Sequence, residues 1–124
     1  MNDPERNMKY SERMPAPDAA LFREDASRKQ RVIESVSLAH SQGFDGAVLE
    51  WRLYVKPWGV DLSRLRVPTS LWYGDTDGMA PANMGRRLAT LIPHARLEVL
   101  KDEAHLSLIH RHAARVVEEL LAPG

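Results

Sequence analysis

The stretch at residues 67–108 constrains the fold more than any other part of the chain, because it predicts a strand, a helix and a second strand. The run T-S-L-W-Y at 69–73 is mostly apolar, as in a strand covered on both faces. Pro68 precedes it, where a strand tolerates a missing N–H, and a second apolar run follows at 96–100. Strand, helix and strand in so short a stretch form a βαβ unit, so we expect two parallel strands with a right-handed crossover.

Helices are predicted between the two strands and after the second one. The first helix begins at Pro81, where the missing N–H is harmless, and ends at Pro93, and the second covers 108–121. Apolar residues recur at helical spacing in both, so each helix should bury one face. The predicted buried residues are Met84, Leu88, Leu91 and Ile92 in the first helix, and Ile109, Ala113, Val116, Val117, Leu120 and Leu121 in the second.

The first half of the chain is less regular. Residues 1–23 are rich in charge and proline, which predicts an irregular segment. Helices are predicted at 25–42 and at 45–56, and Pro57 stops the second of them. Trp58 is predicted to anchor the crossing to the sheet by packing, and a stacking platform for a ligand is the alternative.

Composition excludes several classes of function. The 124 residues suffice for one small domain. Lys+Arg and Asp+Glu are balanced at 17 each, so no strong field favours nucleic acid or an anionic membrane as a partner. The sequence has no cysteine, which excludes disulfides, thiolate catalysis and Cys-based zinc sites. Neither an apolar leader nor a run of membrane-spanning length is found, so we expect a cytoplasmic protein.

Acidic and basic side chains follow the two predicted strands. Asp75 and Asp77 come after the first strand, and His105 comes after the second. Ligands of parallel α/β sheets sit outside the carboxyl ends of the strands, and there a carboxylate can orient an imidazole that takes a proton from a nucleophile. We predict that Asp77 and His105 form such a pair. Asp75 could serve instead of Asp77, and either aspartate could simply form the turn.

A metal site is a weaker alternative. His105, His110, His112 and Glu103 are close in sequence, but positions two apart on a helix point in different directions. Glu103 is predicted to be a solvated loop charge. Phosphate-cradling glycine motifs are absent. We therefore predict neither a metal nor a cofactor.

The segment V-P-T-S-L-W-Y-G-D-T-D-G-M-A-P, followed by A-R-L-E-V-L-K-D-E-A-H-L-S-L, resembles the C-terminal third of an α/β-hydrolase. The resemblance implies that Asp77 is the triad acid and His105 the triad base, with Gly74 as the turn glycine. It also implies an α/β fold class: a partial α/β-hydrolase fold, with two parallel strands at the C-terminal end of the sheet and about four helices. Residues 1–57 would be a remnant of the cap region and 58–124 the C-terminal βαβα part.

Two departures from the family pattern matter. Ala104 stands where the family usually has glycine before the histidine, and no G-x-S-x-G nucleophile elbow occurs in the sequence. The resemblance therefore implies the C-terminal fragment of an ester- or amide-type hydrolase, or of a relative acting on C–C or C–halogen bonds. We expect the isolated chain to be inactive, because the nucleophile and the oxyanion hole are both missing.

Other functions remain open from the sequence. The chain could be a non-catalytic interaction module or a pseudoenzyme that pairs with another chain, or an unrelated small α/β binding domain. A small-molecule substrate is implied only for the parent enzyme. An exposed strand edge predicts pairing with a partner chain or self-association.

Overall fold

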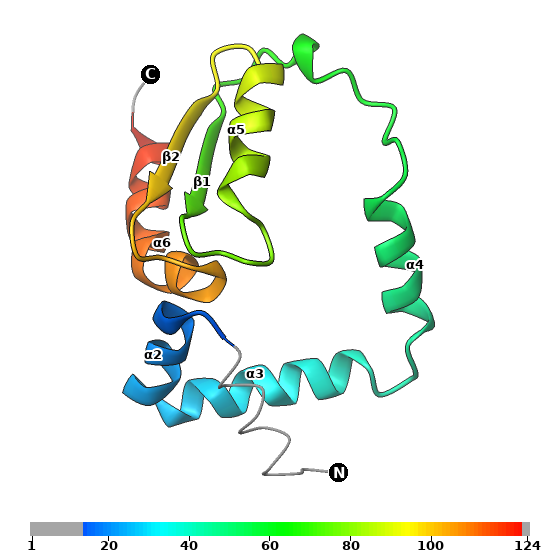
Figure 1. Ribbon diagram of the computed structural model, residues 1–124, viewed down its shortest axis with the longest axis vertical. Coiled ribbons are helices and arrows are strands. Elements are labelled where there is room, and N and C mark those ends of the chain that lie inside the picture. The colour runs from blue at the N-terminus through cyan, green and yellow to red at the C-terminus, as the bar shows by residue number, and fades with distance from the viewer. Residues whose placement is uncertain (1–13, 123–124) are drawn as a thin grey trace. The chain divides into compact units, whose positions relative to one another are not determined.

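The computed structural model describes residues 14–122, and within them it contains five helices and a two-stranded parallel sheet (Figure 1). The described residues divide into two compact units: one holds those up to Leu21 and from Leu62 onward, and the other holds Phe22–Asp61. The elements are, in order, α2 (Ala16–Glu24), α3 (Ala26–Ala39), α4 (Asp45–Tyr54), a 3-10 turn (Leu62–Arg64), β1 (Ser70–Gly74), α5 (Ala82–Leu91), β2 (Arg96–Leu100) and α6 (His105–Leu121).

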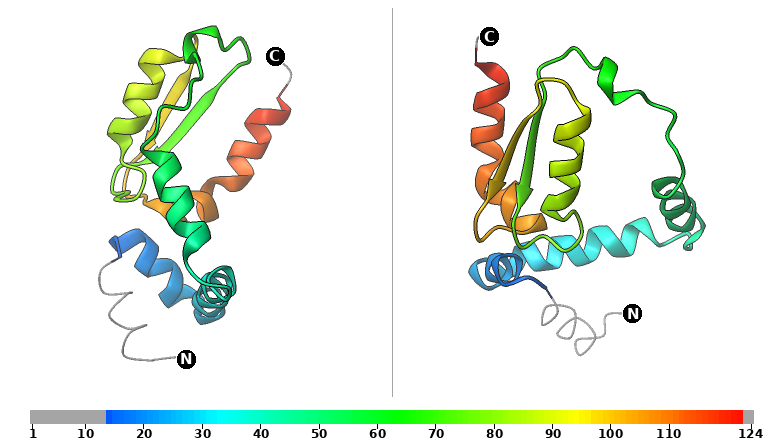
Figure 2. Two further views of the ribbon diagram at one scale, coloured as in Figure 1. Left: turned by 90° about the vertical axis from the view of Figure 1, so that its right-hand side faces the viewer. Right: turned by 45° about the horizontal axis from the view of Figure 1, so that its top comes forward.

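The predicted strand–helix–strand unit is confirmed. β1 and β2 pair in parallel, with Ser70 opposite Arg96 and Gly74 opposite Leu100. The two views in Figure 2 place α5 on one face of this sheet and α6 on the other. The second strand has the predicted bounds, and the first is displaced by one residue toward Gly74.

Close packing of α5 on the sheet depends on Gly85. A Cβ atom at this position would lie 2.4 Å from the ring of Tyr73 and 3.0 Å from Cδ1 of Leu97. Because side chains alternate between the faces of a strand, Tyr73 and Leu97 define the face that α5 covers. In α5 the predicted burial holds for Ile92 just beyond its end and Leu88 is half-buried, whereas Met84 and Leu91 are exposed, which contradicts the prediction.

The opposite face of the sheet is polar where α6 crosses it. Glu119 accepts a hydrogen bond from Ser70 and forms an ion pair with Arg96. The guanidinium of Arg115 lies 4.6 Å from the ring centroid of Trp72, a cation–π contact. Charged and aromatic groups thus contribute to the contact between this helix and the strands.

The prediction that α6 buries its apolar stripe is wrong. Ile109, Val117, Leu120 and Leu121 are exposed, and Leu120 is 75% exposed. At 3.6 residues per turn, this stripe lies about a third of a turn away from Arg115 and Glu119, the residues that contact the sheet. A two-stranded sheet offers too little surface to cover both sides of the helix. The helix also begins earlier than predicted, at His105 rather than at 108.

The first described helix was not predicted. Residues 1–23 were expected to be irregular, but Ala16–Glu24 form α2; residues 1–13 lie outside the described part of the chain. Pro17 falls in the first turn, where its missing N–H costs no hydrogen bond, and Leu21 is buried. With α2, the described chain has five helices instead of about four.

The unit at Phe22–Asp61 contains most of the exposed aromatic surface. The predicted helices are present as α3 and α4, but neither contains a fully buried residue. Trp58 is 72% exposed and donates a hydrogen bond from Nε1 to the carbonyl of Leu53 at 3.0 Å. It is therefore not the packing anchor that the sequence predicted. None of the helices within residues 14–122 is long and apolar enough to cross a membrane.

Candidate functional site

The turn after β1 is bound to the loop after β2 by backbone hydrogen bonds. The N–H of Asp75 donates to the carbonyl of Leu100 at 3.0 Å. Thr76 donates twice to the carbonyl of Glu103, from its N–H at 3.0 Å and from Oγ1 at 2.7 Å. These bonds extend the parallel pairing beyond the strands, so the two segments that follow them are held side by side.

Gly74 permits this close approach. A Cβ atom at residue 74 would lie 2.3 Å from the carbonyl oxygen of Glu103 and 2.9 Å from the nitrogen of Ala104. Any side chain would push the two segments apart. The absence of a side chain at Gly74 therefore determines how near the aspartate turn comes to the start of α6.

Asp77 and His105 meet at this edge of the sheet. Oδ2 of Asp77 lies 3.0 Å from Nδ1 of His105. Oδ1 accepts hydrogen bonds from the N–H groups of Met79 and Ala80 at 2.7 and 2.9 Å. Both oxygens of the Asp77 carboxylate therefore have hydrogen-bond partners. The two backbone bonds to Oδ1 hold the carboxylate in an orientation that directs Oδ2 toward the imidazole.

The pair combines a buried acid with an accessible base. The side chain of Asp77 is 7% exposed, whereas that of His105 is 38% exposed. With an ionised carboxylate as its partner, Nδ1 is the nitrogen that carries the proton, which leaves Nε2 with the lone pair. Nε2 is then the atom that can accept a proton from another group. The structure thus brings together the two residues that the sequence singled out.

Asp75 does not share this environment. Its side chain is exposed, and its contribution to the turn is the backbone hydrogen bond to Leu100. Of the two aspartates in G-D-T-D-G, the geometry therefore favours Asp77 as the partner of His105.

The first turn of α6 is capped from a distant part of the sequence, which sequence reasoning missed. Ala104 is the N-cap residue and has no side-chain acceptor. Instead, Oδ1 of Asp18 in α2 accepts hydrogen bonds from the N–H groups of Leu106 at 3.0 Å and Ser107 at 2.8 Å. The sequence offers one signal, which is that the N-cap residue is alanine. A helix that begins without Ser, Thr, Asp or Asn at the N-cap needs an acceptor from elsewhere.

Glu103 is buried, so its prediction as a solvated loop charge is wrong. It is 7% exposed, and its Oε1 lies 2.9 Å from Nε2 of His112, while Oε2 lies 3.5 Å from Arg111. Burial raises the pKa of Glu103, but hydrogen bonds from Ser107 and His112 and the charge of Arg111 together outweigh it and leave the pKa below its usual value. Asp102, the residue before Glu103, has a φ of 56°, in the left-handed region.

Histidines of α6 do not converge with carboxylates on one point. His105 pairs with Asp77 and His112 pairs with Glu103, whereas His110 is exposed. Within the part of the chain that the structure describes, no group of three or more His, Asp or Glu side chains could hold a metal ion.

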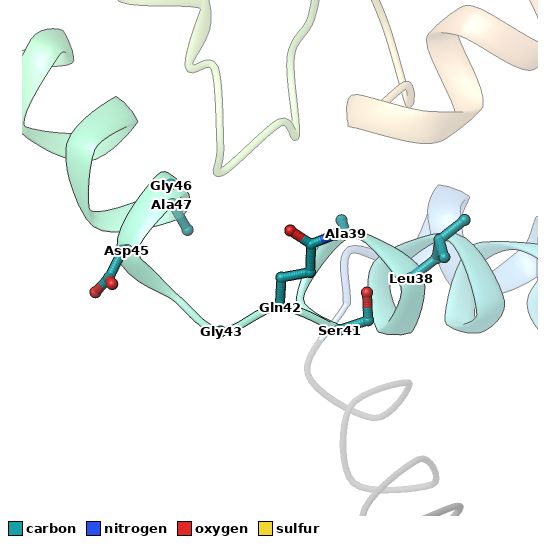
Figure 3. Close-up of a pocket in the computed structure, with 8 residues that line it drawn as sticks. All are labelled: Leu38, Ala39, Ser41, Gln42, Gly43, Asp45, Gly46 and Ala47. Atoms are coloured by element: carbon teal, nitrogen blue, oxygen red, sulfur yellow. The ribbon is translucent and has the colours of Figure 1, made fainter.

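Two open hollows are lined by residues of the unit at Phe22–Asp61. One, of about 570 Å³, lies where the end of α3 turns into α4 (Figure 3). The other, of about 600 Å³, is mainly apolar and is lined by His40, Phe44, Ala47, Val48, Trp51, Arg52 and Val55. Neither hollow is lined by Asp77 or His105, so neither is part of the candidate site at the carboxyl edge of the sheet.

No family model matches the chain, and no curated protein matches it significantly.

Proposed function

We propose that this chain carries the acid and the histidine of an α/β-hydrolase catalytic triad, and that it corresponds to the C-terminal part of such an enzyme. The observation that supports this most directly is the 3.0 Å contact between Oδ2 of Asp77 and Nδ1 of His105 at the carboxyl edge of two parallel strands. In this fold the acid follows one strand and the histidine follows a later one, which is the order seen here.

A turn-forming aspartate alone does not account for this arrangement. Oδ1 of Asp77 makes both bonds that a turn requires, to the N–H groups of Met79 and Ala80. Its second oxygen contributes nothing to the turn and instead contacts His105. The pairing therefore needs a separate reason, and orientation of an imidazole base provides one.

The proposed reaction is acyl transfer to a nucleophile that another segment or chain supplies. Nε2 of His105 accepts the hydroxyl proton as the nucleophilic oxygen attacks the carbonyl carbon of a small ester or amide. Asp77 stabilises the imidazolium, which then gives the proton to the leaving group. His105 next takes a proton from water as the water oxygen attacks the acyl carbon, and it returns that proton to the nucleophilic oxygen as the bond between this oxygen and the acyl group breaks and the acid leaves. Relatives that act on C–C or C–halogen bonds would use the same base.

A second candidate is a non-catalytic module that binds another chain. The exposed apolar stripe of α6 favours it, as do the strand edges of a sheet that has only two strands within residues 14–122. Unpaired edges and apolar surfaces of this kind promote association. In this case Asp77 and His105 would stabilise the turn without turning over a substrate.

Complementation separates the two candidates. The chain alone should neither react with a fluorophosphonate probe nor hydrolyse a p-nitrophenyl ester. Added to a polypeptide that carries early strands and a G-x-S-x-G elbow, encoded upstream in frame or one frameshift away, it should restore both activities. His105→Ala should abolish them and Asp75→Asn should not. Co-elution without any activity would support the binding module, and activity that survives His105→Ala would contradict the hydrolase proposal.

A further inference from the structure

The start of α6 depends on a carboxylate that is remote in sequence. Asp18 precedes Leu106 and Ser107 by 88 and 89 residues, and it is only 2% exposed. Its Oδ1 occupies the place that the side chain of an N-cap residue normally takes. Ala104 contributes only backbone groups: its N–H donates to Oγ of Ser107 at 2.7 Å, and its carbonyl accepts from the N–H of Leu108 at 3.2 Å.

The chain also contains an ordinary cap for comparison. Asp25 is the N-cap residue of α3, and its Oδ1 accepts from the N–H groups of Ser27 at 2.9 Å and Arg28 at 3.2 Å. Asp18 makes the same pair of bonds to the second and third residues of α6, but from another helix. The two carboxylates thus accept from the same backbone positions, but Asp18 is buried, whereas Asp25 is more exposed and also pairs with Arg31.

What lies beside the Asp18 cap is His105, the first residue of α6. We propose that Asp18 is a positioning residue for the Asp77–His105 pair. The inference rests on the proposed function, in which the orientation of His105 matters. Uncapped first turns leave their N–H groups without partners and fray. Because the direction of a helical side chain follows from the backbone that carries it, loss of the cap would move the imidazole away from Asp77.

Through Asp18, α2 therefore helps to position the side chains at the carboxyl edge of the sheet. The carboxylate of Asp18 also lies at the positive end of the α6 dipole, where a negative charge is favourable. The base is therefore held from two directions: Asp77 fixes the ring through Nδ1, and Asp18 fixes the backbone that carries it. A small displacement of a base from its reactive geometry is enough to lower a reaction rate strongly.

The test uses the full-length chain, labelled with ¹⁵N, and reads the Nδ1 proton of His105 by NMR. His105→Gln assigns the signal. Asp18→Ala should abolish it, while circular dichroism and the signals of β1 and β2 show that the domain is folded. Asp25→Ala, which removes the equivalent cap of α3, should leave it unchanged. Adding Ala104→Ser to Asp18→Ala places an acceptor at the N-cap and should restore the signal at least in part.

Asp18→Asn provides a second measurement if the alanine variant does not fold. It keeps an oxygen acceptor but loses the charge, so exchange of the His105 Nδ1 proton and of the Leu106 and Ser107 amide protons should accelerate several-fold. An unchanged Nδ1 signal in folded Asp18→Ala, or unchanged exchange in Asp18→Asn, would overturn the proposal. The readout needs no turnover. A negative NMR result would therefore not refute the proposed hydrolase function, and inactivity of the complemented enzyme would not by itself change the Nδ1 signal of His105.

Discussion

Asp77 and His105 are 28 residues apart in sequence, and Oδ2 of one lies 3.0 Å from Nδ1 of the other. Two further contacts make this distance possible. Thr76 donates two hydrogen bonds to the carbonyl of Glu103, and Gly74 leaves room for that carbonyl. The Asp77–His105 contact thus follows from the parallel register of β1 and β2, because the segments after the two strands remain hydrogen-bonded to each other.

Asp77→Asn should weaken both the turn and the contact with His105. The amide can supply one acceptor but no charge, and hydrogen bonds to charged groups contribute more than neutral ones. We expect the free energy of unfolding to fall by about 1–2 kcal/mol, measured by urea denaturation. The matched control is Asp75→Asn, because Asp75 has an exposed side chain and should change stability by less than about 0.5 kcal/mol. Equal losses in the two variants would show that the contact contributes nothing.

Gly85→Ala should destabilise the sheet unit through overpacking. The new Cβ would lie 2.4 Å from the ring of Tyr73 and 3.0 Å from Leu97, so the helix or the ring must shift. Such insertions into packed interiors typically cost about 1–3 kcal/mol. The measurement is the midpoint of thermal or urea unfolding.

Gly46→Ala is the matched control for that substitution. Gly46 lies in α4 with nothing within 4 Å of its added Cβ, so alanine should be neutral or stabilise the helix by about 0.5–1 kcal/mol. Destabilisation of similar size at Gly46 and Gly85 would refute the packing argument.

The position of Glu103 predicts a pH dependence of stability. Its pKa is lowered in the folded protein, because hydrogen bonds from Ser107 and His112 and the charge of Arg111 outweigh the effect of burial, which raises it. A lowered pKa means that the folded state binds the proton less readily than the unfolded state. The stabilisation is therefore present above the ordinary glutamate pKa and is lost as the pH falls through the folded value.

Glu103→Gln should remove this contribution. The free energy of unfolding of the wild type should decrease as the pH falls below 4.5, the ordinary pKa of a glutamate side chain, and the variant should show a shallower decrease. Glu118→Gln, at an exposed position of α6, is the control and should retain the wild-type slope. An unchanged slope in Glu103→Gln would mean that other carboxyl groups account for the acid sensitivity.

Local patterns in the sequence were enough to predict the strands and most helices. The predicted bounds agree closely with those of β1, α5 and β2. They came from the apolar runs at 69–73 and 96–100 and from the proline at 81. The spacing of Asp77 and His105 relative to the strand ends also predicted that the two would meet. These features depend on near neighbours in sequence or on the general geometry of parallel sheets.

Burial could not be predicted in the same way. Whether the apolar stripe of α6 is covered depends on how many strands and helices lie next to it, and periodicity carries no such information. Asp18 was missed because its two partners are remote in sequence, and Glu103 because its partners, Arg111 and His112, lie on the helix that follows and meet it only in the folded chain. Contacts between residues that are apart in sequence decided both cases.

The exposed stripe of α6 gives the last prediction. Leu120 and Val117 are exposed, whereas Ile92 at the end of α5 is buried. Leu120→Gln and Val117→Gln should therefore change the free energy of unfolding by less than about 0.5 kcal/mol, whereas Ile92→Ala should cost about 2–4 kcal/mol. Sedimentation velocity should show reduced self-association in the glutamine variants, because they remove apolar surface. Glutamine variants as destabilised as Ile92→Ala would show that another surface covers the stripe in solution.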